Sequence, residues 1–176
     1  MTLIVEDGTV VAGAESYVEV AEFKTYCTAR GISFAATTDT QIEQNARLAF
    51  DYLLWKYRGQ WKGYRKSAIQ KGDWPRSFVY LEPFYQGAVG SYPFLVDENT
   101  IPDEIKRAQF ELMQRVVDTE LMPDLGQQET SITVGPISVS FDKNSEQATR
   151  YETVDNILKP YLSNNNRSGN QTVQRV

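Results

Sequence analysis

Apolar side chains recur at helical spacing in three long segments of the chain. The clearest pattern lies in 41–57, where apolar residues are separated by 4, 3, 1, 3 and 4 positions: Ile42, Ala46, Ala49, Phe50, Leu53 and Tyr57. Such spacing places one apolar stripe along a helix. The residues Thr40-Gln-Ile-Glu43 form a capping box before it. The pattern predicts an α-helix over 41–57.

The segments 20–30 and 102–121 show the same spacing. The first carries an apolar stripe and is followed by a C′ glycine: Val20, Phe23, Tyr26, Cys27 and Gly31. Its start falls between Ser16 and Val20, since Ser16 with Glu19 forms a capping box and a start at Glu19 fits equally well. The second opens with a proline and two acids, followed by an apolar face: Pro102, Asp103, Glu104, Ile105, Ala108, Leu112 and Val116.

The C-terminal third changes character twice. Residues 130–134 and 137–141 alternate apolar and polar around Gly135-Pro136, which predicts a β-hairpin. A short fourth helix is predicted from Tyr151, Val154, Ile157 and Leu158, and Pro160 ends it. After it, 163–176 is polar. The predicted fold is mainly α: a small bundle of three main helices and a short C-terminal one, with a β-hairpin and an extended C-terminal tail.

Length and loop content set the expected domain organisation. The 176 residues fit one domain. We expect this domain to span 1–162, with an aromatic insertion at 77–100 where aromatics alternate with Pro and Gly without a regular period. The polar tail 163–176 has two valines as its apolar residues, so it cannot form a core and is expected to become ordered on a partner.

Composition excludes several classes of function. The chain has no histidine, which removes the usual general base and the commonest metal ligand, and it has no phosphate-binding glycine loop. Residues 142–153 lack the glycine and the glutamate of a calcium loop. We therefore expect no enzyme and no cofactor. The single cysteine indicates a reducing compartment, and no apolar run is long enough for a membrane span.

The charge distribution singles out one stretch. Residues 55–76 hold all three tryptophans, and 56–76 carry a net charge of +6 against −11 on the rest of the chain. Cations interleaved with aromatic rings suit a nucleic-acid surface, where phosphates and bases are bound together. They equally suit a protein interface. Trp61 and Trp74 are expected to line the core.

The nucleic-acid surface and the protein interface each predict a set of contact residues. A neighbouring subunit or another partner protein would contact cations of this stretch and polar residues of the tail: Arg58, Lys62, Arg65, Lys66, Arg76, Asn164, Asn165, Asn166, Arg167 and Arg175. A nucleic acid would contact Trp61, Lys62, Tyr64 and Arg65.

Several ordered motifs resemble one known family. They are Val5-Glu-Asp-Gly8, Ser16-Tyr-Val18, Ala29-Arg-Gly31, Tyr57-Arg-Gly-Gln-Trp-Lys-Gly63, Trp74-Pro-Arg76, Ile101-Pro-Asp-Glu-Ile-Lys-Arg-Ala108, Val134-Gly-Pro-Ile137 and Tyr151-Glu-Thr-Val-Asp-Asn-Ile-Leu158. Over about residues 3–162 the chain resembles a tailed-phage family labelled DnaT-like single-stranded DNA-binding protein, whose members look like head–tail connector (adaptor) proteins of the neck. The insertion at 77–98 and the extension after 162 depart from the family pattern.

The resemblance implies a structural virion protein of a bacteriophage. Such a head–tail adaptor would form a dodecameric ring beneath the portal protein, extend the channel for genomic double-stranded DNA, and contact other neck or tail-completion proteins. It would be assembled in the host cytoplasm and dock on the portal through its C-terminal tail. The alternative is a single-stranded DNA-binding accessory protein of replication.

Overall fold

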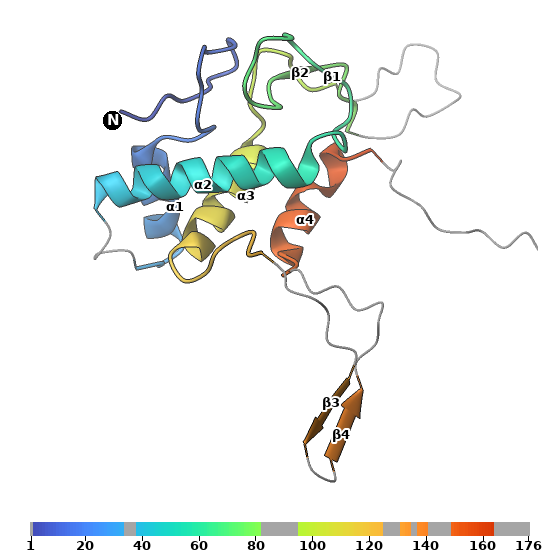
Figure 1. Ribbon diagram of the computed structural model, residues 1–176. Coiled ribbons are helices and arrows are strands. Elements are labelled where there is room, and N and C mark those ends of the chain that lie inside the picture. The colour runs from blue at the N-terminus through green and yellow to red at the C-terminus, as the bar shows by residue number, and fades with distance from the viewer. Residues whose placement is uncertain are drawn as a thin grey trace, which may run out of the picture.

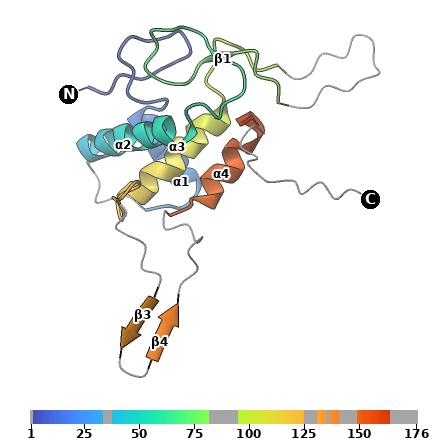
Figure 2. The same cartoon turned by 45° about the vertical axis from the view of Figure 1, so that its right-hand side comes forward.

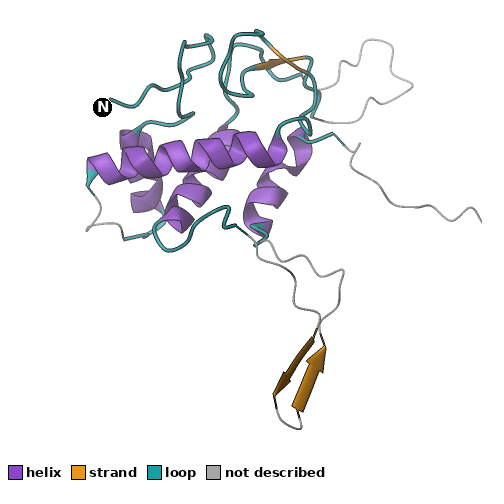
Figure 3. Ribbon diagram, in the orientation of Figure 1, coloured by secondary structure: helices purple, strands orange, loops and turns teal. Residues whose placement is uncertain are grey.

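The computed structural model describes residues 2–33, 38–81, 95–124, 131–134, 137–140 and 149–163. The helices are α1 (Val20–Ala29), α2 (Asp39–Tyr57), α3 (Asp103–Val116), α4 (Glu152–Leu158) and the 3-10 turn η1 (Lys159–Tyr161). The strands are β1 (Tyr64–Arg65), β2 (Arg76–Ser77), β3 (Ser131–Val134) and β4 (Ile137–Ser140). The predicted class is confirmed: helices dominate and a hairpin is present (Figure 3). The tail beyond Ser163 lies outside the described residues.

The helix boundaries differ from the prediction for local chemical reasons. The capping box of α2 is made by Thr38 and Gln41, so the helix begins at Asp39 instead of 41. The same spacing recurs two residues later, with Thr40 and Glu43, but the structure uses the earlier box. In α1 the N-cap is Glu19, whose backbone N–H donates to Glu22 at 2.9 Å. The third helix ends at Val116, short of the predicted 121.

α2 and α3 form the centre of the fold, and α1 and α4 pack beside them. Figures 1 and 2 show α2 lying across α3. In Figure 1, α1 lies near the N-terminal end of α2, and α4 lies near the C-terminal end of α2. The apolar stripes predicted from the sequence face this contact, and the side chains of Phe50, Leu53, Ile105 and Leu112 are buried. Each buried side chain of this size contributes roughly 1.5–3 kcal/mol. No described helix combines the length and hydrophobicity that crossing a membrane requires.

The hairpin pairs as the alternation predicted. β3 and β4 are antiparallel, with Ile132 opposite Val139 and Val134 opposite Ile137. Positions directly opposite each other share one face of a sheet, so the register places the four apolar positions together. Both views draw the strands clear of the helices (Figures 1 and 2).

A buried glutamine joins three parts of the fold. Gln109 of α3 is fully buried; its carbonyl accepts the backbone N–H of Tyr17 at 2.9 Å. Its amide donates to the Ser16 hydroxyl and to the carbonyl of Ala46 in α2, both at 2.9 Å. The side chain therefore fixes the segment before α1 against α2 and α3.

We predict that Gln109→Leu lowers the free energy of unfolding by about 1–3 kcal/mol, because it leaves buried polar groups without partners. The matched control is Gln114→Leu in the same helix, whose side-chain amide donates to the carbonyl of Phe110 one turn earlier and to no other group among the described residues. That variant should change stability by about 0.5 kcal/mol or less. Urea denaturation followed by circular dichroism measures both, and equal effects would contradict the role given to Gln109.

Candidate nucleic-acid interface

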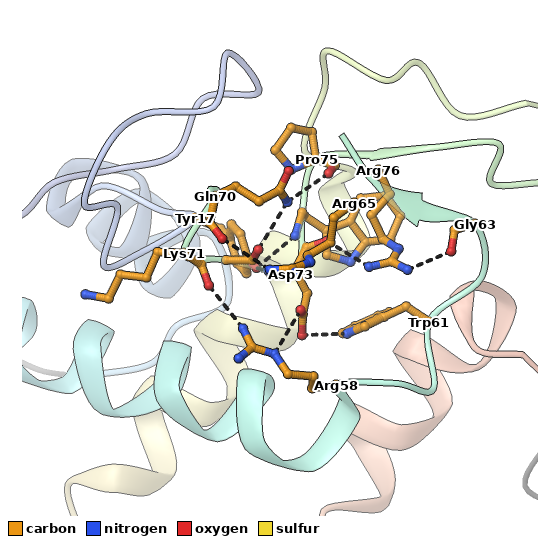
Figure 4. Close-up of polar contacts among 12 residues, drawn as sticks. Tyr17, Arg58, Trp61, Gly63, Arg65, Gln70, Lys71, Asp73, Pro75 and Arg76 are labelled. Atoms are coloured by element: carbon orange, nitrogen blue, oxygen red, sulfur yellow. Dashed lines mark hydrogen bonds and ion pairs between the residues drawn. The ribbon is translucent and has the colours of Figure 1, made fainter. Parts of the chain in front are cut away.

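The loop from Arg58 to Ser77 has little regular structure and is held by buried polar side chains (Figure 4). The hydroxyl of Tyr17 accepts the backbone N–H groups of Asp73 at 2.9 Å and Trp74 at 3.2 Å. Burial raises the pKa of Tyr17, so its hydroxyl stays neutral. One side chain from outside the loop thus satisfies two of the loop's buried donors.

Arg76 fastens the two ends of the same loop. Its guanidinium donates to the carbonyls of Lys62 at 2.8 Å, Gly63 at 2.7 Å and Asp73 at 3.1 Å. The residue is 8% exposed, and this burial lowers its pKa. The planar fork of an arginine can serve three carbonyls at once, which a lysine cannot reproduce.

The carboxylate of Asp73 is the third anchor. It accepts the indole N–H of Trp61 and the Nε–H of Arg58, both at 3.2 Å. Trp61 and Trp74 are 6% and 0% exposed and pack edge to face, with ring centroids 5.7 Å apart. The expectation that these two tryptophans line the core is confirmed. Together, Tyr17, Asp73, Arg76 and the two indoles form what we call the buried loop anchor.

The buried loop anchor presents Tyr64 and Arg65 to solvent, and Lys62 and Lys66 lie half-buried beside them. β1 pairs with β2 so that Tyr64 lies opposite Ser77 and Arg65 opposite Arg76. Consecutive side chains of a strand point to opposite faces, yet both residues of β1 are exposed. Tyr64 is 75% exposed. We call residues 62–66 the exposed basic segment.

Some cations of the basic stretch are neutralised by acids from other parts of the chain. Lys56 pairs with Asp155 at 3.2 Å, and Lys71 pairs with Glu15 at 3.8 Å. Arg58 pairs with the Asp73 carboxylate of the buried loop anchor. These charges are therefore not free to attract phosphates strongly.

The cations of the exposed basic segment have neutral partners instead. Lys62 donates to the carbonyls of Tyr80 and Pro160, at 3.0 and 2.7 Å. Arg65 donates to the carbonyl of Gln70 at 3.3 Å, and Lys66 donates to the side-chain oxygen of Asn99. Within the described part of the chain no ion pair joins these three cations to a carboxylate. Three positive charges thus lie within two residues of Tyr64, whose ring is exposed.

Two further exposed rings lie beside this segment. Phe78 is 63% and Tyr80 42% exposed. Gly63 allows the backbone of β2 to approach the backbone before β1 closely, because a Cβ at position 63 would stand 2.2 Å from the Ser77 carbonyl oxygen. Phe78 adopts a left-handed φ of 60°, which is costly for a non-glycine residue. Both rings belong to the predicted insertion at 77–100 and follow β2, in which Ser77 lies opposite Tyr64.

Arg58, one of the predicted contact residues, pairs with Asp73. The structure sorts the other predicted contact residues into three groups. It brings Lys62, Tyr64, Arg65 and Lys66 together at the surface. The side chains of Arg76, predicted as a partner contact, and of Trp61, predicted as a nucleic-acid contact, are buried and hydrogen-bonded inside the protein. The predicted tail contacts lie outside the described residues.

No group of acidic or sulfur ligands suited to a metal ion occurs among the described residues. Two pockets of the described surface lie elsewhere, one between α1 and α3 and one beside α2. Neither is lined by a residue of the exposed basic segment.

We predict that Arg76→Lys lowers the free energy of unfolding by about 1–3 kcal/mol, since the three carbonyls are bonded by three different nitrogens of the guanidinium and one ammonium nitrogen cannot reach all three positions. Arg65→Lys is the matched control, because Arg65 is exposed and makes one hydrogen bond to a carbonyl. It should change stability by about 0.5 kcal/mol or less. Urea denaturation distinguishes the two, and indistinguishable midpoints would overturn the anchoring role.

Comparison with known proteins now bears on this surface. The whole chain, residues 1–176, matches the family described as "Putative DnaT-like ssDNA binding protein". No curated protein and no solved structure matches it. The family description names DNA binding and no role in a virion, so the expectation of a phage head–tail adaptor in the neck, with its portal contact and dodecameric ring, is corrected. The chain belongs to the DnaT-like single-stranded DNA-binding protein family.

Proposed function

We propose that this protein binds single-stranded DNA along the exposed basic segment, and that it serves replication as an accessory protein. The observation that carries the proposal is that three cations lie within two residues of the exposed Tyr64 ring and that none of them pairs with an acid among the described residues. Cations and rings in one place are the two elements that bind a flexible strand. The family description supports the choice of ligand.

Each residue type has a separate task in the proposed complex. Lys62, Arg65 and Lys66 bind successive phosphates. This electrostatic contribution to the binding free energy is independent of the base sequence. The ring of Tyr64 stacks on a base, with Phe78 and Tyr80 available for neighbouring bases. Stacking requires a base face that is free, and in a duplex the faces are covered by adjacent base pairs. The surface is therefore selective for single strands.

The charge of the rest of the molecule confines the strand to this surface. The protein carries a net charge of −5, although the exposed basic segment contributes three positive charges. Acidic surfaces elsewhere repel phosphates, whereas the segment attracts them. We therefore expect one short contact site on each molecule, in contrast to a continuous basic surface.

Removing the Tyr64 ring tests the stacking step. Tyr64→Ala should raise the Kd for an oligothymidylate of about 15 nucleotides by roughly 5- to 150-fold, because one base–ring stack contributes about 1–3 kcal/mol. Tyr64→Phe keeps the ring and should bind like the parent protein. Fluorescence anisotropy measures both. If the alanine variant bound as tightly as the phenylalanine variant, stacking at this position would be excluded.

The salt dependence of binding tests the phosphate contacts. With three contacts, the plot of log K against log salt should have a slope of about −2, and Lys62→Gln, Arg65→Gln and Lys66→Gln should each reduce its magnitude by about 0.7. Lys24→Gln is the control. Lys24 pairs with Asp39 at the start of α2, a helix of 19 residues, so it lies roughly 28 Å along the helix axis from the end that leads to the segment.

The control variant should keep the parent slope. A slope that does not change in the three glutamine variants, or that changes equally in Lys24→Gln, would contradict the assignment of phosphates to the exposed basic segment.

A further inference from the structure

A second surface has a chemistry different from that of the exposed basic segment. A groove of about 420 Å³ runs between α2 and the residues that follow α3. Its lining comes from Leu48, Asp51, Tyr52, Trp55, Val116, Thr119, Glu120, Leu121 and Met122. We call it the α2–α3 groove. The proposed DNA contact uses none of these residues.

The floor of the groove is apolar and open to solvent. Leu48, Tyr52 and Trp55 follow one another at 4 and 3 positions, so they lie along one face of α2. Trp55 is 67% exposed and Leu48 53% exposed, and Met122 on the opposite wall is 46% exposed. Large apolar side chains grouped in this way indicate an interaction site.

The polar part of the lining is acidic. Asp51 and Glu120 line the groove, and no lysine or arginine does. Burial raises the pKa of Asp51 although Lys71 acts in the opposite direction. Within the described residues neither carboxylate takes part in an ion pair. A half-buried carboxylate that makes no ion pair among the described residues is a group that a basic ligand would stabilise.

We propose that the α2–α3 groove binds an amphipathic helix of a partner protein, with apolar side chains one turn apart and lysine or arginine beside them. The apolar side chains fill the space between Leu48, Trp55 and Met122, and the cations pair with Asp51 and Glu120. The acidic lining disfavours a DNA strand at this place because it would repel phosphates. This inference is independent of the proposed DNA contact.

Tryptophan fluorescence of the full chain tests the proposal, because Trp61 and Trp74 are buried and Trp55 is exposed. The probe is a synthetic helix of about 14 residues with leucine at positions i, i+3, i+4 and i+7 and lysine elsewhere. Binding should shift the emission of Trp55 to shorter wavelength, and Trp55→Phe should abolish the shift. The double variant Asp51→Asn, Glu120→Gln should weaken binding at least tenfold.

The control peptide has the same leucines with glutamate in place of lysine, and it should bind at least tenfold more weakly. The double variant should retain the parent affinity for oligothymidylate, which separates this site from the DNA contact. Leu48→Ser should weaken peptide binding without loss of secondary structure.

Three results would overturn the proposal. The first is the absence of a spectral shift, or equal binding of the two peptides. The second is a blue shift that grows with protein concentration alone, which would assign the groove to a second copy of the chain. The third is a red shift on deletion of 164–176 without any peptide, which would assign it to the protein's own C-terminal residues.

Discussion

The backbone groups of the loop between α2 and β2 need partners, and this need determines how the functional surface is built. β1 and β2 are two residues each, so strand pairing satisfies few of them. Three side chains form hydrogen bonds with seven further backbone groups of the loop. Tyr17 accepts two N–H groups, Gln70 donates to two carbonyls and Arg76 donates to three. A buried group left unpaired costs about 1–3 kcal/mol. The exposed basic segment keeps its shape because these interactions are made inside.

The C-terminal helices complete this support. The rings of Tyr57, Trp61, Trp74 and Tyr161 follow one another with centroids 5.7, 5.7 and 5.5 Å apart. The backbone N–H of Lys62 donates to the carbonyl of Tyr161 at 2.9 Å. Segments about 100 positions apart in sequence therefore meet below the exposed basic segment. The DNA contact that we propose depends on the whole domain being folded.

Local pattern was sufficient to predict the helices and the hairpin. The stripes of α1, α2 and α3 repeat over several turns, so their type follows from periodicity, whereas their ends depend on single capping contacts such as Thr38 with Gln41. Two capping boxes two residues apart are equivalent in sequence. The structure has the earlier box, made by Thr38 and Gln41.

The candidate site was predictable in composition but not in arrangement. The +6 charge of 56–76 was visible, yet Lys56 is neutralised by Asp155 and Lys71 by Glu15, and these pairs exist only through tertiary folding. For the same reason the sequence did not show that Arg76 is an internal anchor. The α2–α3 groove was not predicted either, because an apolar residue such as Trp55 has the same appearance in sequence whether a neighbour covers it or not.

In the proposed complex a strand of DNA lies against Tyr64 and is held there by the cations beside it. Ultraviolet crosslinking of oligothymidylate to the full chain, followed by peptide mass spectrometry, locates the contact directly. We expect the nucleotide adduct on the peptide that contains Tyr64, with weaker adducts at Phe78 or Tyr80. An adduct confined to the peptide that contains Trp55, or the absence of any adduct at a DNA concentration that saturates binding, would contradict the account.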